Sequence, residues 1–145
     1  MTITDLHKAT TPALEVDYLN VAIMPADRQL LHRRIEDRLA LMLEAGFVAE
    51  VRALSELPNM SAAVPAMRAV GYRQMWSHVA GELSLLEAAR EAAAATRQLA
   101  KRQMTWLRSW PALTTFDSLD ENLDGRIDNL INAWLADGAS ADISS

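Results

Sequence analysis

The chain contains no cysteine and only five glycines in 145 residues. Without cysteine it can form neither a disulfide framework nor a thiolate metal site. The glycines are scattered, and the phosphate-cradling patterns G-x-x-x-x-G-K-S/T and G-x-G-x-x-G do not occur. The patterns G-x-S-x-G and H-E-x-x-H are missing as well, so the sequence carries none of the short motifs of nucleotide, esterase or zinc-protease sites.

Long apolar runs are also missing. The most apolar run, residues 19–24, is far shorter than the ~20 residues that cross a bilayer, and no N-terminal run resembles a signal peptide. Hydrophobic residues nevertheless make up 50% of the chain, which is enough for the core of one small domain. We therefore expect a globular, cytoplasmic protein without a membrane span.

Clusters of titratable residues are scarce. The histidines His7, His32 and His78 are far apart in the sequence and show no metal-ligand spacing. Glu36 and Asp37 are adjacent, but neighbouring residues of a helix point to different sides, so these two are not expected to act together as a general acid and a general base. A metal site assembled from distant residues stays open at this point, but we predict neither a metal site nor a catalytic residue in this chain.

Basic charge is concentrated between Arg68 and Arg108, although the chain as a whole carries a net charge of −5. This stretch holds seven of the 14 Lys and Arg residues against three acids, a net charge of +4. The segment before it sums to −3 and the segment after it to −6. Such a local concentration of cations is typical of a surface that binds nucleic acid.

A long helix is predicted in this stretch, because Ser84 and Glu87 form a capping box and Pro111 closes the far end. One side of the helix carries basic residues, namely Arg90, Arg97, Lys101 and Arg108. The opposite side is apolar and is predicted to be buried: Leu85, Ala88, Ala92, Ala95, Leu99 and Trp106. A basic stripe can be a plain solvated surface, but residues 92–110 contain no acid, which favours phosphate binding.

The remaining periodicities predict a mostly α-helical chain with about five helices and one or two short strands. Besides the long helix, helices are predicted at 27–45, 47–57, 67–80 and 122–136, with Gly46 and Gly81 as terminating glycines. Strands are predicted at 16–24 and 113–116. Because two short strands rarely form a stable sheet alone, we expect further strands outside this chain.

Two stretches carry a family resemblance: RAVGYRQMW at 68–76 and ATRQLAKRQMTWLR at 95–108. They strongly resemble the C-terminal part of the tRNA dimethylallyltransferases, also called tRNA isopentenyltransferases. The similarity continues upstream through LHRRIEDR at 31–38 and MLEAGFVAEV at 42–51, so it covers roughly residues 15–116.

The resemblance implies a cytoplasmic, usually monomeric enzyme that uses magnesium and has a P-loop-kinase-like α/β fold. Such enzymes transfer the dimethylallyl group of dimethylallyl diphosphate to N6 of the adenosine 3′ of a tRNA anticodon. The family's diphosphate-binding loop and catalytic base belong to an N-terminal half that has no counterpart in this sequence. We therefore expect a C-terminal fragment, inactive alone, whose partners are the N-terminal half and the tRNA anticodon stem-loop.

The resemblance also implies binding residues. The tRNA-contacting positions are Arg68, Ala69, Val70, Gly71, Tyr72, Arg73, Arg97, Lys101, Arg102, Gln103, Thr105 and Arg108. Gly71 would let RNA approach the backbone closely, and Tyr72 either stacks on a base or belongs to the core. Trp76 and Trp106 are interpreted as core residues. Arg38 and Arg34 are candidates for the diphosphate, with pairing to neighbouring carboxylates as the alternative.

Three segments are expected in the chain. Residues 1–116 would form the transferase part, 117–137 an amphipathic helix, and 138–145 a disordered tail. Two other functions are kept as alternatives to the fragment of a transferase. One is a stand-alone helical RNA-binding module, and the other is a structural helical module that docks on a partner chain through its apolar face.

Overall fold

The computed structural model describes residues 17–141, and these residues form five α-helices, one 3-10 helix and two strands. A mostly helical chain with two short strands was predicted, and this is confirmed. The elements in chain order are β1 (Asn20–Met24), α2 (Arg28–Glu44), α3 (Phe47–Ser55), the 3-10 helix η1 (Pro65–Arg68), α4 (Tyr72–Val79), α5 (Leu85–Arg108), β2 (Leu113–Asp117) and α6 (Leu123–Ala141).

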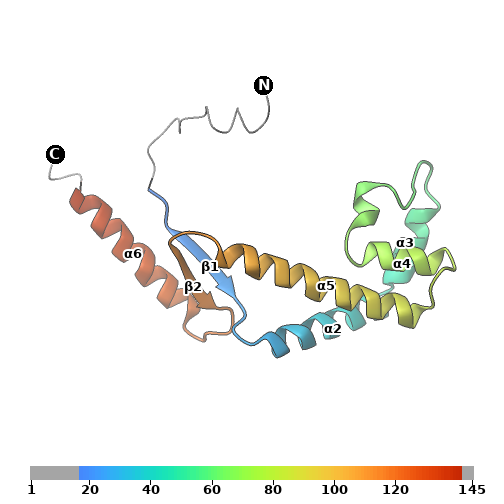
Figure 1. Cartoon of the computed structure of the whole chain (residues 1–145), viewed down its shortest axis with the longest axis horizontal. Helices are drawn as coiled ribbons and strands as arrows, with labels where there is room; N and C mark the ends of the chain where they lie inside the picture. Colours follow the sequence, from blue (N-terminus) through green and yellow to red (C-terminus); the bar gives the residue numbers. More distant parts are fainter. Residues whose placement is uncertain (1–16, 142–145) are drawn as a thin grey trace, which may run out of the picture.

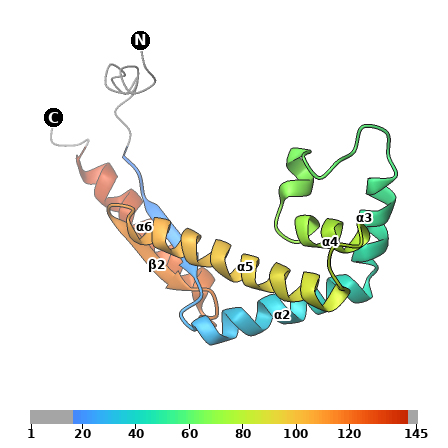
Figure 2. The ribbon, with the colours of Figure 1, turned by 45° about the vertical axis from the view of Figure 1, so that its right-hand side comes forward.

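The molecule is elongated, with two helices joining its two ends (Figure 1). The chain leaves the strands along α2 and returns to them along α5, and both views show these helices side by side (Figure 2). At one end lie β1, β2 and α6, and at the other lie α3, η1 and α4. The basic stretch of the sequence therefore spans most of the length of the molecule.

The two strands form a parallel pair with Asn20 opposite Leu113 and Met24 opposite Asp117. Both predicted strands are confirmed, but β1 begins only at Asn20; residues 17–19, predicted as strand, are not part of it, and residue 16 lies outside the described part. Ala22 is buried on one face of the pair, and on the other face Phe116 is buried while its register partner Ile23 is half exposed. Parallel sheets are normally covered on both faces and contain more than two strands, so the exposure of Ile23 is unusual.

Both ends of α2 are set by capping residues that can be read from the local sequence. Asp27 caps α2 by accepting a hydrogen bond from the backbone N–H of Gln29 at 2.7 Å. Gly46 follows the end of α2 with a φ of 97°, in the left-handed region that favours glycine. The prediction that Gly46 terminates this helix is confirmed.

The single helix predicted for 67–80 is wrong, because the structure contains η1 and α4 with a break between them. The break ends at Gly71, which has a φ of 95°. The buried side chain of Gln74 accepts a hydrogen bond from the Gly71 N–H at 2.9 Å and so caps α4. This side-chain bond satisfies a backbone group that a continuous helix would have used, and the glycine tolerates the backbone angle.

The predicted capping box of α5 is confirmed. The backbone N–H of Ser84 donates to Glu87 Oε2 at 2.8 Å, and the Glu87 N–H donates to Ser84 Oγ at 3.2 Å. The helix ends at Arg108, shortly before Pro111. These two signals suffice because both depend only on residues within a few positions of the helix ends.

The core lies between α3, α4 and the first half of α5. Its buried members are Phe47, Val51, Met75, Ala88 and Ala92. The small alanines of α5 allow α4 to pack closely, while Phe47 and Val51 fill the space from α3.

The predicted burial of the whole apolar side of α5 is wrong in its second half. Leu99 and Trp106 are exposed, the latter by 58%, and Leu85 at the start of the helix is exposed as well. The reason is tertiary, since α3 and α4 pack against the first half of α5 and do not reach the second half.

Helix α6 is anchored to the end of β2 and is longer than predicted. The Asp120 carboxylate accepts from the Asn122 N–H at 3.0 Å and pairs with Arg126, whose guanidinium lies 5.2 Å from the centre of the Phe116 ring. The helix continues through 138–141, where a tail was expected, and residues 142–145 lie outside the described part. None of the described helices is long and apolar enough to cross a membrane.

The capping carboxylates predict a loss of stability in acid. Hydrogen bonds from the hydroxyl and then the backbone N–H of Ser84 lower the pKa of Glu87. Those from the Asn122 N–H and then Arg126 lower the pKa of Asp120. A lowered folded-state pKa adds stability that is present above the unfolded-state value, 4.5 for Glu87, and is lost as the pH falls through the folded-state value.

We expect the thermal unfolding midpoint to drop as the pH is lowered from about 6 to about 3. Circular dichroism melts measure this directly. The drop should be smaller in Glu87→Gln, which keeps a capping side chain but no longer titrates. Glu56→Gln, at an exposed position after α3, is the control, and an equal pH profile for both variants would contradict the assignment to the capping box.

Candidate nucleic-acid interface

Residues 68–73, here called the 68–73 turn, connect η1 to α4 and rest on α3. Arg68 and Arg73 are accessible to solvent, whereas Gly71 between them is buried. A Cβ atom on Gly71 would lie 3.6 Å from the Phe47 ring. Gly71 was predicted to let RNA approach the backbone; in the structure it is buried, and its φ of 95° lies in the region that favours glycine. The charged side chains of the turn, Arg68 and Arg73, are therefore both accessible.

Tyr72 is held by α3 on two sides. Its hydroxyl donates a hydrogen bond to Glu50 Oε1, and its ring meets the Phe47 ring edge-on with centroids 5.1 Å apart. The hydrogen bond to Glu50, followed by burial, raises the pKa of Tyr72 above its ordinary value of 10.0. These contacts support the interpretation of Tyr72 as a core residue, and Trp76 packs half-buried against the same core.

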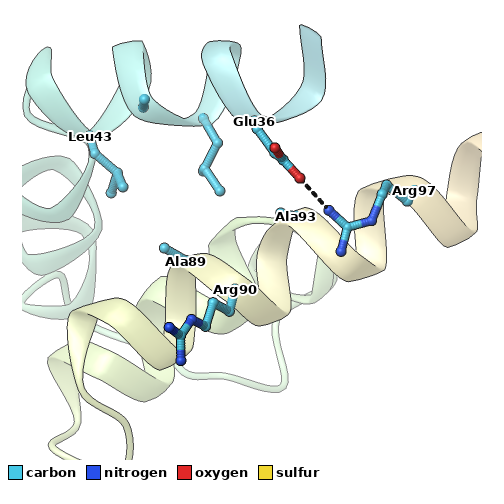
Figure 3. A pocket seen from close by; sticks show the side chains of 8 residues that line it. Glu36, Leu43, Ala89, Arg90, Ala93 and Arg97 are labelled. Carbon is cyan, nitrogen blue, oxygen red and sulfur yellow. Dashed lines mark hydrogen bonds and ion pairs between the residues drawn. The ribbon is translucent and has the colours of Figure 1, made fainter. Parts of the chain in front are cut away.

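Arg97, one of the four residues of the predicted basic stripe, is paired with an acid. Its Nη1 atom lies 2.9 Å from Glu36 Oε1 on α2, with the two side chains 31% and 59% exposed (Figure 3). The sequence did not show this, because the acid comes from a helix 61 positions away. Arg97 is therefore less available to phosphate than was predicted, and the stripe is divided at this point.

A pocket of about 320 Å³ surrounds this ion pair between α2 and α5. Its lining is mostly apolar: Leu43 from α2 lies across from Ala89 and Ala93 of α5, with Arg90 nearby (Figure 3), and Leu39 also lines it. The alanines keep the two helices close enough for Glu36 to reach across.

Lys101, Arg102 and Arg108 remain free cations on the second half of α5. All three are exposed, and within residues 17–137 none of them forms an ion pair. Gln103 and Thr105 are exposed on the same half of the helix. The implied tRNA-contacting positions of α5 beyond Arg97 are thus all accessible.

Trp106 lies beside these cations and was missed as a candidate contact residue. It helps to line a surface hollow of about 440 Å³, together with Gln98, Lys101, Arg102, Thr105 and Ser109. Its ring meets the Trp110 ring with centroids 4.7 Å apart. Trp106 was interpreted as core because it follows the apolar spacing of α5, and spacing alone does not tell whether another element covers a face.

A groove of about 690 Å³ separates α2 from α5 and the 68–73 turn. Arg34 and Arg38, the two candidates for the diphosphate, line it from α2. Val70 and Gly71 line it from the turn, and Thr96 from α5. The structure thus brings together two sets of implied residues that are about thirty positions apart in the sequence.

The acids next to Arg34 and Arg38 do not neutralise them. Glu36 pairs with Arg97 instead, and neither arginine forms an ion pair with a described residue. The expected alternative of pairing between neighbours on α2 is therefore not realised in the structure. The groove also contains Asp37, so its lining combines two cations with one acid.

These features define a class of protein: a mainly helical module with a cationic surface, joined to a parallel β-pair of the α/β type. The family model for IPP transferase matches residues 1–110. A tRNA dimethylallyltransferase from Thiobacillus denitrificans is 50% identical over 128 residues, which are 88% of this chain and 41% of that protein. The chain belongs to the IPP transferase family.

Two solved structures resemble the whole arrangement. The full-length tRNA isopentenylpyrophosphate transferase from Bacillus halodurans matches 86% of this chain with a TM-score of 0.75 and 27% identity. The tRNA isopentenylpyrophosphate transferase from Staphylococcus epidermidis matches 80% with a TM-score of 0.66 and 27% identity. The chain spans 41% and 36% of these two proteins, respectively.

The Glu36–Arg97 pair predicts a measurable coupling between α2 and α5. Both side chains are partly exposed, so solvent screening limits the coupling free energy to about 0.2–1 kcal/mol. A double-mutant cycle with Glu36→Ala and Arg97→Ala, followed by urea unfolding, measures it. Glu44→Ala on the same helix should be additive with Arg97→Ala, and additivity in both cycles would show that the ion pair adds nothing.

Proposed function

We propose that this chain supplies the tRNA-contacting part of an enzyme that modifies tRNA by prenyl transfer. The donor would be dimethylallyl diphosphate, and the acceptor N6 of the adenosine 3′ of the anticodon. Membership of the IPP transferase family supports the reaction class. The observation that carries the contact role is the set of exposed, unpaired cations Lys101, Arg102 and Arg108 on α5, among the described residues.

The acceptor adenosine imposes a physical requirement that these cations meet. An adenosine within an anticodon loop is stacked, and its amino group becomes reachable only when the base leaves the stack. Contacts that hold the phosphates on either side of the base, here called clamps, offset part of the free energy needed to unstack it. In our proposal Arg68 and Arg73 form one clamp, and Lys101 and Arg102 form another along α5.

Trp106 adds an aromatic surface to the α5 contact. Its exposed indole lies in the same hollow as Lys101 and Arg102. Unstacked bases are commonly received by aromatic side chains in proteins that bind single-stranded RNA. We propose that Trp106 contacts a base or ribose of the anticodon loop while the neighbouring cations contact phosphates.

The groove suits the diphosphate end of the donor. Arg34 and Arg38 line it without carboxylate partners among the described residues, and guanidinium groups bind phosphate oxygens in a bidentate manner. In the transfer, N6 forms a bond to C1 of the dimethylallyl group as the C–O bond to diphosphate breaks, and the N6 proton passes to a base. The two arginines would stabilise the negative charge on the departing diphosphate.

The phosphate-binding loop, the catalytic base and magnesium are assigned to the part of the family's proteins that this chain does not span. No described group of three histidine, aspartate or glutamate residues could hold a metal ion, so we assign magnesium to none of them. The glycine loop for phosphate is also missing from the sequence. We propose that the rest of a P-loop-kinase-like fold joins the open parallel pair of β1 and β2 and brings the loop, the base and magnesium.

Exposed apolar side chains support such a partner surface. Ile23 on β1 and Ile131, Trp134 and Leu135 on α6 are all exposed at the sheet end of the molecule. A helical module that only docks on a partner would show the same surface. The cations on α5 favour the RNA-contacting role over a purely structural one.

The cationic surface predicts salt-sensitive binding to a tRNA anticodon stem-loop. Lys101→Ala/Arg108→Ala should bind more weakly than the unchanged chain, and its salt slope should be smaller by about two, because two phosphates are no longer neutralised. Arg28→Ala/Arg52→Ala removes the same charge from α2 and α3 and is the matched control. Fluorescence anisotropy at two salt concentrations measures both properties.

The two possible failures of this experiment differ in meaning. If both double variants lose affinity equally, net charge and not the α5 surface governs binding. If the unchanged chain does not bind the stem-loop at all, these 145 residues do not form an RNA-contacting unit by themselves, and the structural alternative gains support.

The assignment of the diphosphate loop to another part of the protein predicts that the isolated chain transfers no dimethylallyl group. Incubation with labelled dimethylallyl diphosphate, magnesium and tRNA should leave the tRNA unlabelled. A full-length family member provides the positive control. Label in the tRNA above the no-enzyme background would show that the chain contains a complete active site and would overturn this assignment.

A further inference from the structure

We infer that Glu50 is a positioning residue for RNA contact, acting through Tyr72. The hydrogen bond between them fixes the 68–73 turn on α3 in the orientation that presents Arg68 and Arg73 together. This inference rests on the proposed function, since the orientation of the two arginines matters only if they meet RNA.

The turn has local bonds that set its shape. The Gly71 N–H donates to Gln74 Oε1 at 2.9 Å, and the Arg73 N–H donates to the Ala69 carbonyl at 3.1 Å. The preceding η1 is only four residues long. These bonds connect the turn to itself and to α4, and they do not determine how the turn sits on the rest of the molecule.

The packing of α4 on α5 places the turn, and contacts with α3 add to its orientation. Phe47 is 4% exposed; its ring meets that of Tyr72 edge-on and lies 3.6 Å from where a Cβ on Gly71 would stand. Such apolar contacts are non-directional and allow sliding or rotation at little cost. A hydrogen bond between two side chains, in contrast, requires a defined direction and distance.

Glu50 accepts the directional hydrogen bond from the Tyr72 hydroxyl. It lies three residues after Phe47, so both side chains project from one side of α3. Tyr72 is the first residue of α4 and directly follows Gly71, so fixing its hydroxyl fixes the start of α4 and the end of the turn. Arg73 follows at once in the same helix, and its direction depends on the same anchor.

The Tyr72 hydroxyl stays a donor at neutral pH. The same hydrogen bond raises the pKa of Tyr72 above 10.0, so its hydroxyl keeps its proton and remains a donor. The ring contact with Phe47 keeps the hydroxyl close to Glu50. The anchor therefore acts as a fixed part of the surface and not as a switch.

Four variants test the inference. Glu50→Ala and Tyr72→Phe remove the bond, Glu50→Gln keeps an acceptor oxygen at the same place, and Ser84→Ala removes the α5 capping box away from the turn. Ser84→Ala is the stability control, because loss of a cap lowers the melting temperature without touching the turn. Two quantities are measured well below the melting temperatures: affinity for an anticodon stem-loop, and hydrogen exchange of the backbone amides of residues 69–73.

We expect Glu50→Ala and Tyr72→Phe to bind RNA about fivefold more weakly and to exchange these amides faster. Glu50→Gln should restore both quantities to near the level of the unchanged chain. Ser84→Ala should leave both unaltered, even if its melting temperature is as low as that of Glu50→Ala.

Unchanged amide exchange in Glu50→Ala would overturn the inference, whether or not RNA binds. So would a loss of affinity that follows the melting temperature across all four variants. Failure of the unchanged chain to bind RNA, with faster amide exchange in Glu50→Ala, would refute the proposed function while leaving the anchor itself established as a structural element.

Discussion

The close packing of α4 on α5 is the constraint on which the rest of the structure depends. Ala88 and Ala92 are small enough for Met75 to be buried completely between the two helices, and Val51 closes the same space from α3. This contact places the 68–73 turn next to α2 and α5, which creates the groove that holds Arg34 and Arg38. Larger side chains at the two alanines would push α4 outward and separate the arginines of the turn from those of the groove.

The charge of the α5 surface depends on which basic residues are paired as well as on where they lie. The sequence places a row of cations on α5, and α2 then neutralises one of them through Glu36. The cations beyond Arg97 form no ion pair in the described part of the chain, and they are exposed next to Trp106. A protein with a net charge of −5 therefore still has a locally cationic surface, because the field near a surface depends on local charges.

The parallel pair of β1 and β2 explains why the chain looks like part of a larger α/β arrangement. Its strands are joined by the whole helical segment from α2 to α5, which is an unusually long crossover. Ile23 is exposed on one face of the pair, and the apolar residues of α6 are exposed nearby. The chain spans 41% of the length of its relative from Thiobacillus denitrificans, and further strands on this pair would account for the exposed apolar surface.

The sequence by itself determined those features that depend on residues close together in the chain. The Ser84–Glu87 capping box, Gly46 after α2 and the two apolar strands each act within a few positions, so their signals are complete in the local sequence. The family resemblance was likewise carried by contiguous motifs and is confirmed by the IPP transferase match. Tertiary structure decided what depends on a partner from elsewhere, namely the pairing of Arg97 with Glu36 and the exposure of Trp106. Helical spacing shows which side chains share a face, but only the packed molecule shows which faces are covered.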